Sequence, residues 1–123
     1  MISVEGVTKR FGELVAVKNL DFAVDMGEVV GFLGPNGAGK TTTMRMLTGT
    51  LEPDEGRVLY DQVPISRDLT AAKARLGYLP ETNPLYEEML VVEYLEYAAQ
   101  LRMLDSAAAR SAISDAVDET GID

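Results

Sequence analysis

Apolar and polar residues alternate through residues 2–7 and again at Leu20, Phe22 and Val24. A period of two is typical of strands that bury one face, so we expect a small antiparallel sheet at the N-terminus. Residues 29–33, VVGFL, carry no polar side chain, which predicts a strand buried on both faces. The first part of the chain is therefore expected to consist mainly of strands.

Shorter apolar runs at residues 56–60 (GRVLY) and 76–79 (LGYL) predict two further strands with a polar, helical segment between them. After a loop around Pro84, apolar residues recur at the three- and four-residue spacing of amphipathic helices. They are Val91, Tyr94, Leu95, Ala98 and Leu101 in one predicted helix and Ala109, Ile113, Ala116 and Val117 in the other. We therefore expect residues 1–84 to form a strand-rich core and residues 85–123 a helical part.

A glycine-rich loop follows the apolar run. Gly34, Gly39, Lys40 and Thr41 fit the spacing G-x-x-x-x-G-K-[ST] of a phosphate-binding loop. Glycines let successive backbone N–H groups converge on phosphate oxygens, and the positive end of the following helix points to the same place. Lys40 is expected to reach the terminal phosphates, and the Thr41 hydroxyl is placed to bind the Mg²⁺ that bridges them. The loop predicts a site for a nucleoside triphosphate.

The neighbouring residues complete the predicted phosphate site. The remaining loop positions are Pro35, Asn36, Gly37 and Ala38. Thr42 follows Thr41, where its hydroxyl can donate to a further phosphate oxygen. The motif has meaning only between a strand and a helix, and the residues after it, TTTMRML, have a helical pattern that is expected to end at Gly49. The context therefore supports the motif.

Composition excludes several other kinds of chemistry. The chain has 123 residues, a formal net charge of −9, no cysteine and no histidine. Disulfides, thiolate metal sites and a histidine base are thereby excluded, and the charge argues against a broad nucleic-acid or anionic-membrane surface. No apolar run approaches the roughly 18 residues of a membrane helix, and Glu5 and Lys9 interrupt any secretory leader. We expect a cytoplasmic location.

Three motifs in a fixed order resemble a known family. They are KRFG at residues 9–12, LGPNGAGKTTTMRMLTG at residues 33–49 and LGYLPE at residues 76–81. Together they resemble the ATP-binding subunit of ABC transporters, over the whole chain. The resemblance implies an α/β fold: a P-loop NTPase core with an N-terminal antiparallel β-subdomain and the start of a helical lobe, truncated. The third motif is most similar to the ABC-2-type exporter, gliding-motility and multidrug-export groups, which implies export.

The resemblance also implies roles for two residues outside the loop. Phe11 occupies the place of an aromatic residue that stacks on adenine, and the alternative is that its ring simply packs in the hairpin. Glu81 occupies the place of a glutamine that contacts Mg²⁺ or the attacking water. A carboxylate there implies metal contact, a coupling role, or only a solvated position in a loop.

Parts of the family's catalytic site have no match in this sequence. An LSGGQ-like signature, an apolar strand ending in Asp-Glu and a switch histidine are missing, so no catalytic residue is assigned. The nearest imitation, RVLYD, precedes the helical part, and we interpret its Asp61 as a turn residue. We expect the N-terminal portion of a longer ATPase, which binds ATP and Mg²⁺ but hydrolyses ATP only in its complete form. Residues 29–33 are then expected to expose an apolar sheet edge.

Two partners are implied by the resemblance, and nucleic acid is not among them. They are an ABC transporter membrane subunit, contacted around residues 83–89, and a second ATP-binding subunit in a head-to-tail dimer. The protein is then expected on the inner face of the plasma membrane. An alternative hypothesis is a stand-alone nucleotide-binding module that regulates the transporter without hydrolysis. A P-loop GTPase or small-molecule kinase is a third, although the guanine motif N-K-x-D is absent.

Overall fold

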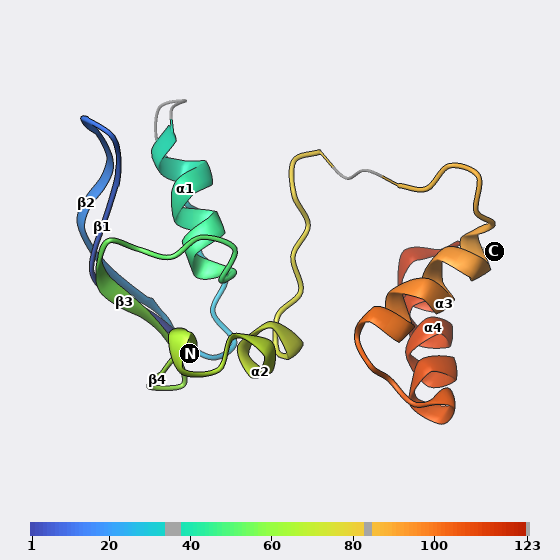
Figure 1. The fold of residues 1–123 in the computed structure, drawn as a ribbon. Coiled ribbons are helices and arrows are strands. Elements are labelled where there is room, and N and C mark those ends of the chain that lie inside the picture. The colour runs from blue at the N-terminus through green and yellow to red at the C-terminus, as the bar shows by residue number, and fades with distance from the viewer. Residues whose placement is uncertain (34–37, 83–84, 123) are drawn as a thin grey trace. The chain divides into compact units, whose positions relative to one another are not determined.

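The computed structural model describes residues 1–33, 38–82 and 85–122. It divides into two compact units, Met1–Tyr78 and Leu79–Asp123 (Figure 1). The first unit contains a four-stranded sheet with helices α1 and α2, and the second contains helices α3 and α4.

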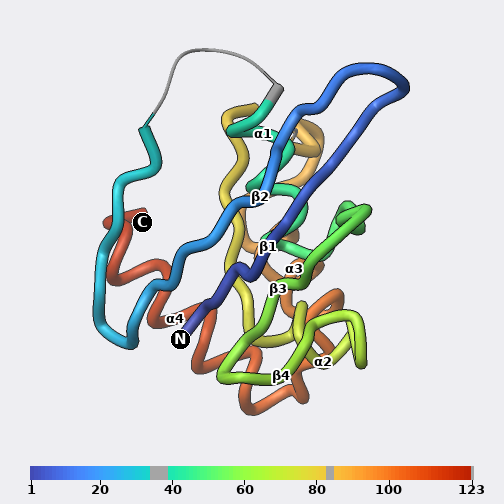
Figure 2. Tube along the Cα trace, turned by 90° about the vertical axis from the view of Figure 1, so that its left-hand side faces the viewer, coloured from blue at the N-terminus to red at the C-terminus, as the bar shows by residue number. Residues whose placement is uncertain are grey.

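An antiparallel hairpin forms the centre of the first unit. Strand β1 (Ile2–Phe11) pairs on one side with β2 (Leu14–Val24) and on the other with β3 (Glu55–Tyr60). The short strand β4 (Val63–Pro64) completes the sheet in the order β2-β1-β3-β4. Figure 2 shows β1 and β2 running side by side as a long hairpin, with β3 alongside β1. The predicted N-terminal antiparallel sheet is confirmed.

Strands β1 and β3 approach each other closely where their pairing is irregular, between Glu5 and Thr8 of β1. Gly56 of β3 has a φ angle of +79°, a conformation that L side chains rarely adopt. A Cβ atom at Gly56 would also collide with the backbone of Glu5 and Gly6. Only glycine fits at this crossing of the two strands.

The core of the first unit joins the sheet to α1 (Ala38–Leu47). Its buried members are Val4, Val7, Val17, Met46, Val58, Tyr60 and Ile65. Met46 lies on α1 and is 2% exposed, and the Tyr60 hydroxyl donates a hydrogen bond to the backbone carbonyl of Leu47. The helix predicted after the glycine-rich loop is confirmed. It ends at Leu47, and Gly49 follows in the turn with a φ angle of +75°.

Between β3 and residue 76 the chain forms a turn and two short helices. The 3₁₀ helix η1 (Ile65–Arg67) is followed by α2 (Leu69–Ala74). The Asp68 side chain accepts a hydrogen bond from the backbone N–H of Ala71 at 3.1 Å and so caps α2. The helical segment predicted between the two runs GRVLY and LGYL is confirmed, as is the strand at GRVLY.

Two of the predicted strands do not form. Residues 29–33 and 76–79 belong to no strand, and the side chains of Val29, Leu33 and Leu79 are 98%, 94% and 80% exposed. A strand buried on both faces needs neighbours that bond its N–H and C=O groups. In the part of the chain that the structure describes, the only sheet is antiparallel, and neither run pairs with it. The apolar exposure expected at residues 29–33 is observed, but the strand prediction was wrong.

The second unit is a pair of helices. Helices α3 (Val91–Leu101) and α4 (Ser106–Thr120) lie side by side (Figure 1). The Asp105 carboxylate accepts a hydrogen bond from the Ala108 N–H at 2.8 Å at the start of α4, and Gly121 ends it with a φ angle of +70°. Both predicted helices are confirmed. Among the described residues, no helix combines the length and apolar character needed to cross a bilayer.

Candidate nucleotide-binding site

Helix α1 begins within the phosphate-binding motif. Four residues of the motif lie outside the described part of the chain: Gly34, Pro35, Asn36 and Gly37. The helix starts at Ala38, so Gly39, Lys40 and Thr41 occupy its first turn. Backbone N–H groups in the first turn of a helix have no partner within the helix and are available to an anion. The last residues of the motif thus form the helix N-terminus that a phosphate site requires.

The first turn of α1 packs closely against β2. A Cβ atom on Gly39 would lie 3.0 Å from the backbone oxygen of Ala16, so the glycine permits this close approach. The Thr43 hydroxyl donates to the Gly39 carbonyl at 2.7 Å. Thr42 and Thr43 are buried, whereas Thr41 is exposed. The residue whose hydroxyl is expected to bind Mg²⁺ is therefore exposed to solvent. The metal contact expected of Thr41 and the phosphate contact expected of Thr42 stay predictions.

The aromatic residue expected to stack on a base lies at the end of β1. Phe11 is 46% exposed, so its ring is not enclosed by the hairpin. The turn between β1 and β2 and the first turn of α1 lie at the same end of the first unit in Figures 1 and 2. Stacking of a base on Phe11 stays a prediction.

Asp54 and Lys9 contact the backbone and the aromatic ring at the end of β1. The Lys9 ammonium lies 3.3 Å from Asp54 Oδ1 and 5.7 Å from the centroid of the Phe11 ring. Asp54 Oδ2 accepts a hydrogen bond from the Arg10 N–H at 2.7 Å, and this bond is the main reason that the pKa of Asp54 is lowered. Sequence reasoning missed these contacts because Asp54 is 44 residues from Arg10. The only local indication was the two-residue spacing of Lys9 and Phe11, which puts both side chains on one side of a strand.

Glu81 lies in the other unit from the phosphate-binding helix. Its side chain is exposed in an irregular segment of Leu79–Asp123. Among the described residues there is no group of three or more Asp, Glu, His or Cys side chains that would hold a metal ion by itself. Mg²⁺ at a nucleotide takes most of its ligands from phosphates and water, so a single Thr41 hydroxyl suits it. The metal contact expected of Glu81 stays a prediction.

Asp61 ends β3 as a turn residue. Its φ angle is +46°, and its carboxylate accepts a hydrogen bond from the α-amino group of Met1 at 2.8 Å and pairs with the Arg75 guanidinium. These contacts, that with the α-amino group first, lower the pKa of Asp61 to about 2. The interpretation of Asp61 as a turn residue is confirmed.

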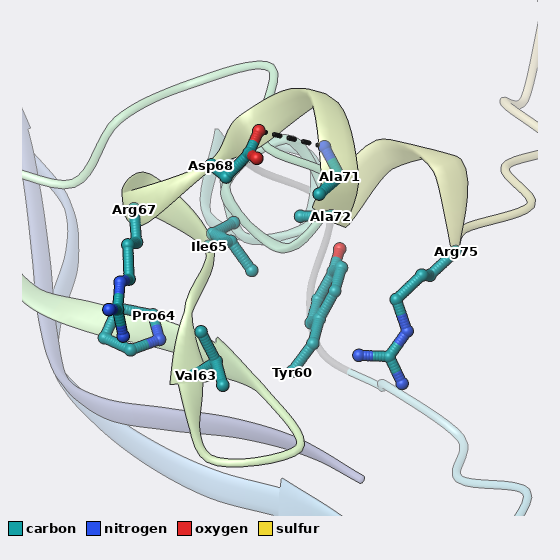
Figure 3. A pocket seen from close by; sticks show the side chains of 9 residues that line it. All are labelled: Tyr60, Val63, Pro64, Ile65, Arg67, Asp68, Ala71, Ala72 and Arg75. Carbon is teal, nitrogen blue, oxygen red and sulfur yellow. Dashed lines mark hydrogen bonds between the residues drawn. The ribbon is translucent and has the colours of Figure 1, made fainter.

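A separate cavity of about 360 Å³ lies between β3 and α2 (Figure 3). Its lining residues are Tyr60, Val63, Pro64, Ile65, Arg67, Asp68, Ala71, Ala72 and Arg75. Three of its polar groups already have partners, because Asp68 caps α2, Arg75 pairs with Asp61, and the Tyr60 hydroxyl bonds to the end of α1. The cavity contains no part of the glycine-rich motif. It therefore lacks the backbone N–H groups that form a phosphate site, and no sequence motif predicted it.

Comparison with known proteins gives the family. The family model described as ABC transporter matches residues 17–122. Nod factor export ATP-binding protein I of Bradyrhizobium diazoefficiens is 44% identical over 94 residues, which cover 76% of this chain and 31% of that protein. The uncharacterized ABC transporter ATP-binding protein YxlF of Bacillus subtilis is 37% identical over 123 residues, which cover 99% and 40%. The probable multidrug ABC transporter ATP-binding protein YbhF of Escherichia coli is 34% identical over 122 residues, which cover 99% and 21%.

Solved structures agree with the sequence matches. An ATP binding subunit of an ABC transporter aligns with a TM-score of 0.77 at 31% identity, over 87% of this chain and 45% of that one. The protein cbiO1 of Clostridium perfringens, part of the transporter complex cbiONQ, aligns with a TM-score of 0.81 at 26% identity, over 99% and 51%. The predicted fold class, part of an α/β P-loop ATPase domain, is confirmed, and the chain spans less than half the length of the curated relatives described above. This chain belongs to the ABC transporter family, among its ATP-binding proteins.

Proposed function

We propose that this chain binds ATP together with Mg²⁺ as part of the subunit that powers an ABC exporter. The observation that carries the proposal is the phosphate-binding motif that opens α1, in a chain whose relatives are named ATP-binding proteins. The expected division into a core of residues 1–84 and a helical part of residues 85–123 belongs to the same proposal.

Each residue of the proposed phosphate site has a task that suits its chemistry. Backbone N–H groups of residues 34 and 36–39 donate to phosphate oxygens, Pro35 having none, and the positive end of α1 favours the anion. Lys40 neutralises charge on the terminal phosphates. The exposed Thr41 offers its hydroxyl to Mg²⁺, and Thr42 supplies a further donor to phosphate. The bound metal ion neutralises phosphate charge that these residues leave uncompensated.

Phe11 is proposed to hold the adenine base. A half-exposed ring at the end of β1 offers an apolar, flat surface, and any base has a face that stacks on such a ring. Stacking of this kind contributes about 1–3 kcal/mol per base in nucleic-acid complexes. The base therefore adds to the affinity that the phosphates supply.

Hydrolysis is proposed for the complete protein only. There, ATP and water are converted to ADP and phosphate, and Glu81 contacts the metal or couples the site to the partner. Within these 123 residues no histidine and no Asp-Glu strand polarises the attacking water, so the chain alone is expected to bind ATP without turnover. Phosphate release above a blank without enzyme, lost in Lys40→Ala, would contradict this expectation.

Export is the direction that we propose, because relatives are named for Nod factor export and multidrug transport. The proposed partners are a membrane subunit, which would hold this chain at the inner face of the plasma membrane, and a second ATP-binding subunit. The membrane subunit would contact residues 83–89, of which 83 and 84 lie outside the described residues. There the Tyr86 ring packs edge-on against the Tyr97 ring, with 5.8 Å between the ring centroids, and its centroid lies 6.4 Å from that of Tyr94. These contacts hold the segment against α3.

A calorimetric titration with MgATP tests the proposal. Lys40→Ala is expected to weaken binding by at least about tenfold, because it removes a charged partner of the phosphates. Lys18→Ala on β2, where the lysine is exposed, removes the same charge elsewhere and is the matched control. Equal affinities of wild type and Lys40→Ala would refute a phosphate site at α1.

A further inference from the structure

We infer that Lys9 positions the half-exposed Phe11 ring for a nucleotide base, by holding one face of the ring with its ammonium group so that the base stacks on the other. This role rests on the proposed stacking of the base on Phe11. It makes recognition of the base depend on a charged side chain at the end of β1, distinct from the residues proposed to hold the phosphates.

The contact between Lys9 and Phe11 has the geometry of a cation–π interaction. The two residues are two positions apart in β1, the spacing that puts side chains on one side of a strand. The Lys9 ammonium nitrogen lies over the ring, 5.7 Å from its centroid, within the range of about 6 Å for such contacts. The Lys9 side chain is only 15% exposed, so water screens this attraction less than it would at an open surface.

Asp54 holds the Lys9 ammonium in place. Its Oδ1 atom lies 3.3 Å from the ammonium nitrogen, while Oδ2 accepts the Arg10 N–H at 2.7 Å. The Asp54 backbone N–H donates to the Thr8 carbonyl at 2.9 Å. The carboxylate is therefore anchored at both oxygens and through its own backbone. A lysine that is held in this way keeps a fixed position over the ring.

A fixed cation over one face of Phe11 has two effects on a ligand. It occupies that face, so a base stacks on the opposite one. It also orders the ring before binding, so less side-chain freedom is lost when the base arrives. Both effects act on the aromatic base of a nucleoside triphosphate. Neither acts on its phosphates, which the residues at the start of α1 are proposed to hold.

The full natural chain, titrated with MgATP and with magnesium tripolyphosphate, tests this role. Tripolyphosphate has no base, so the ratio of the two affinities isolates the contribution of the base. Lys9→Met keeps the length of the side chain and removes its charge, and it is expected to lower that ratio about two- to fivefold. Lys9→Arg, which keeps a cation over the ring, is expected to preserve the ratio. Phe11→Ala is expected to lower it at least as far as Lys9→Met does.

Each of the other outcomes overturns the role of Lys9. If Phe11→Ala lowers the ratio and Lys9→Met does not, the base stacks on Phe11 without help from Lys9, and the proposed function stands. If neither variant changes the ratio, stacking on Phe11 is itself refuted. If Lys9→Met weakens both ligands equally, Lys9 has only a structural role. Thermal melting of each variant confirms that it is folded.

Discussion

The phenolic hydroxyl of Tyr60 donates a hydrogen bond to the backbone carbonyl of Leu47, and so ties β3 to the last turn of α1. The carbonyl is one of those that a helix leaves without an internal partner at its C-terminal end. Tyr60 is 7% exposed, and burial raises the pKa of its hydroxyl. Because α1 starts in the phosphate-binding motif, a contact that holds α1 against the sheet also helps to position the motif.

Removal of the Tyr60 hydroxyl is therefore expected to destabilise the first unit. Tyr60→Phe leaves the carbonyl of the half-buried Leu47 without this partner, at a cost of about 1–3 kcal/mol in the free energy of unfolding. Urea denaturation measures the loss. Tyr78→Phe, at a tyrosine that is 46% exposed, is the matched control and should leave stability unchanged. Equal loss in the two variants would show that the Tyr60 hydrogen bond contributes nothing.

Gly56→Ala is expected to be more damaging than its size suggests. The new methyl group would need a strained positive φ angle and would collide with the backbone of Glu5 and Gly6. Backbone atoms of a paired strand cannot move aside cheaply, so we expect a loss of about 3 kcal/mol or more, or failure to fold. Gly77→Ala is the control, because a Cβ there meets nothing within 4 Å. A folded Gly56→Ala chain with the melting temperature of wild type would refute the close approach.

Two methionines on α1 offer a paired test of how the helix packs. Met46 is 2% exposed and Met44 is 38% exposed. Met46→Ala is expected to cost about 2–5 kcal/mol through lost burial and the cavity left behind. Met44→Ala makes the same chemical change on the same helix and should cost far less. Comparable losses in urea denaturation would mean that α1 does not pack on the sheet through Met46.

Asp61 is expected to make the stability of the fold depend on pH in the acidic range. Its pKa is lowered from 3.8 to about 2 by the Met1 α-amino group and then by Arg75, so the folded state favours the ionised carboxylate. This contribution is present above the unfolded pKa of 3.8 and is lost as the pH falls from there towards 2. The melting temperature of wild type should therefore fall more steeply over that interval than that of Asp61→Asn. Parallel curves for wild type and Asp61→Asn would contradict the prediction.

The sequence predicts local elements well where spacing alone decides them. The alternation around Val4 and Phe22, the helical spacing after Val91 and the glycines that end α1 and α4 all involve residues close together in the chain. The family, and with it the fold class, followed from the same kind of local motif. Contacts across the sheet did not, because nothing near Lys9 in the sequence indicates that Asp54 will lie beside it.

Residues 29–33 show a different limit of prediction from the sequence. Their apolar character predicts burial, but burial requires neighbours, which the sequence of the segment does not contain. Within the described residues no strand pairs with this run, and Val29 and Leu33 are almost fully exposed. The cavity beside Tyr60 escaped prediction for a related reason, because a turn and a six-residue helix create it without any motif.

Hydrogen exchange with and without MgATP tests the central claim most directly, because it locates the nucleotide on the chain. Binding at the phosphate motif predicts slower exchange in peptides that cover residues 31–47, with a smaller effect at residues 9–12, and neither effect in Lys40→Ala. Protection confined to residues 60–75, around the separate cavity, would contradict the account. So would a lack of protection at MgATP concentrations well above the dissociation constants typical of ATP-binding proteins.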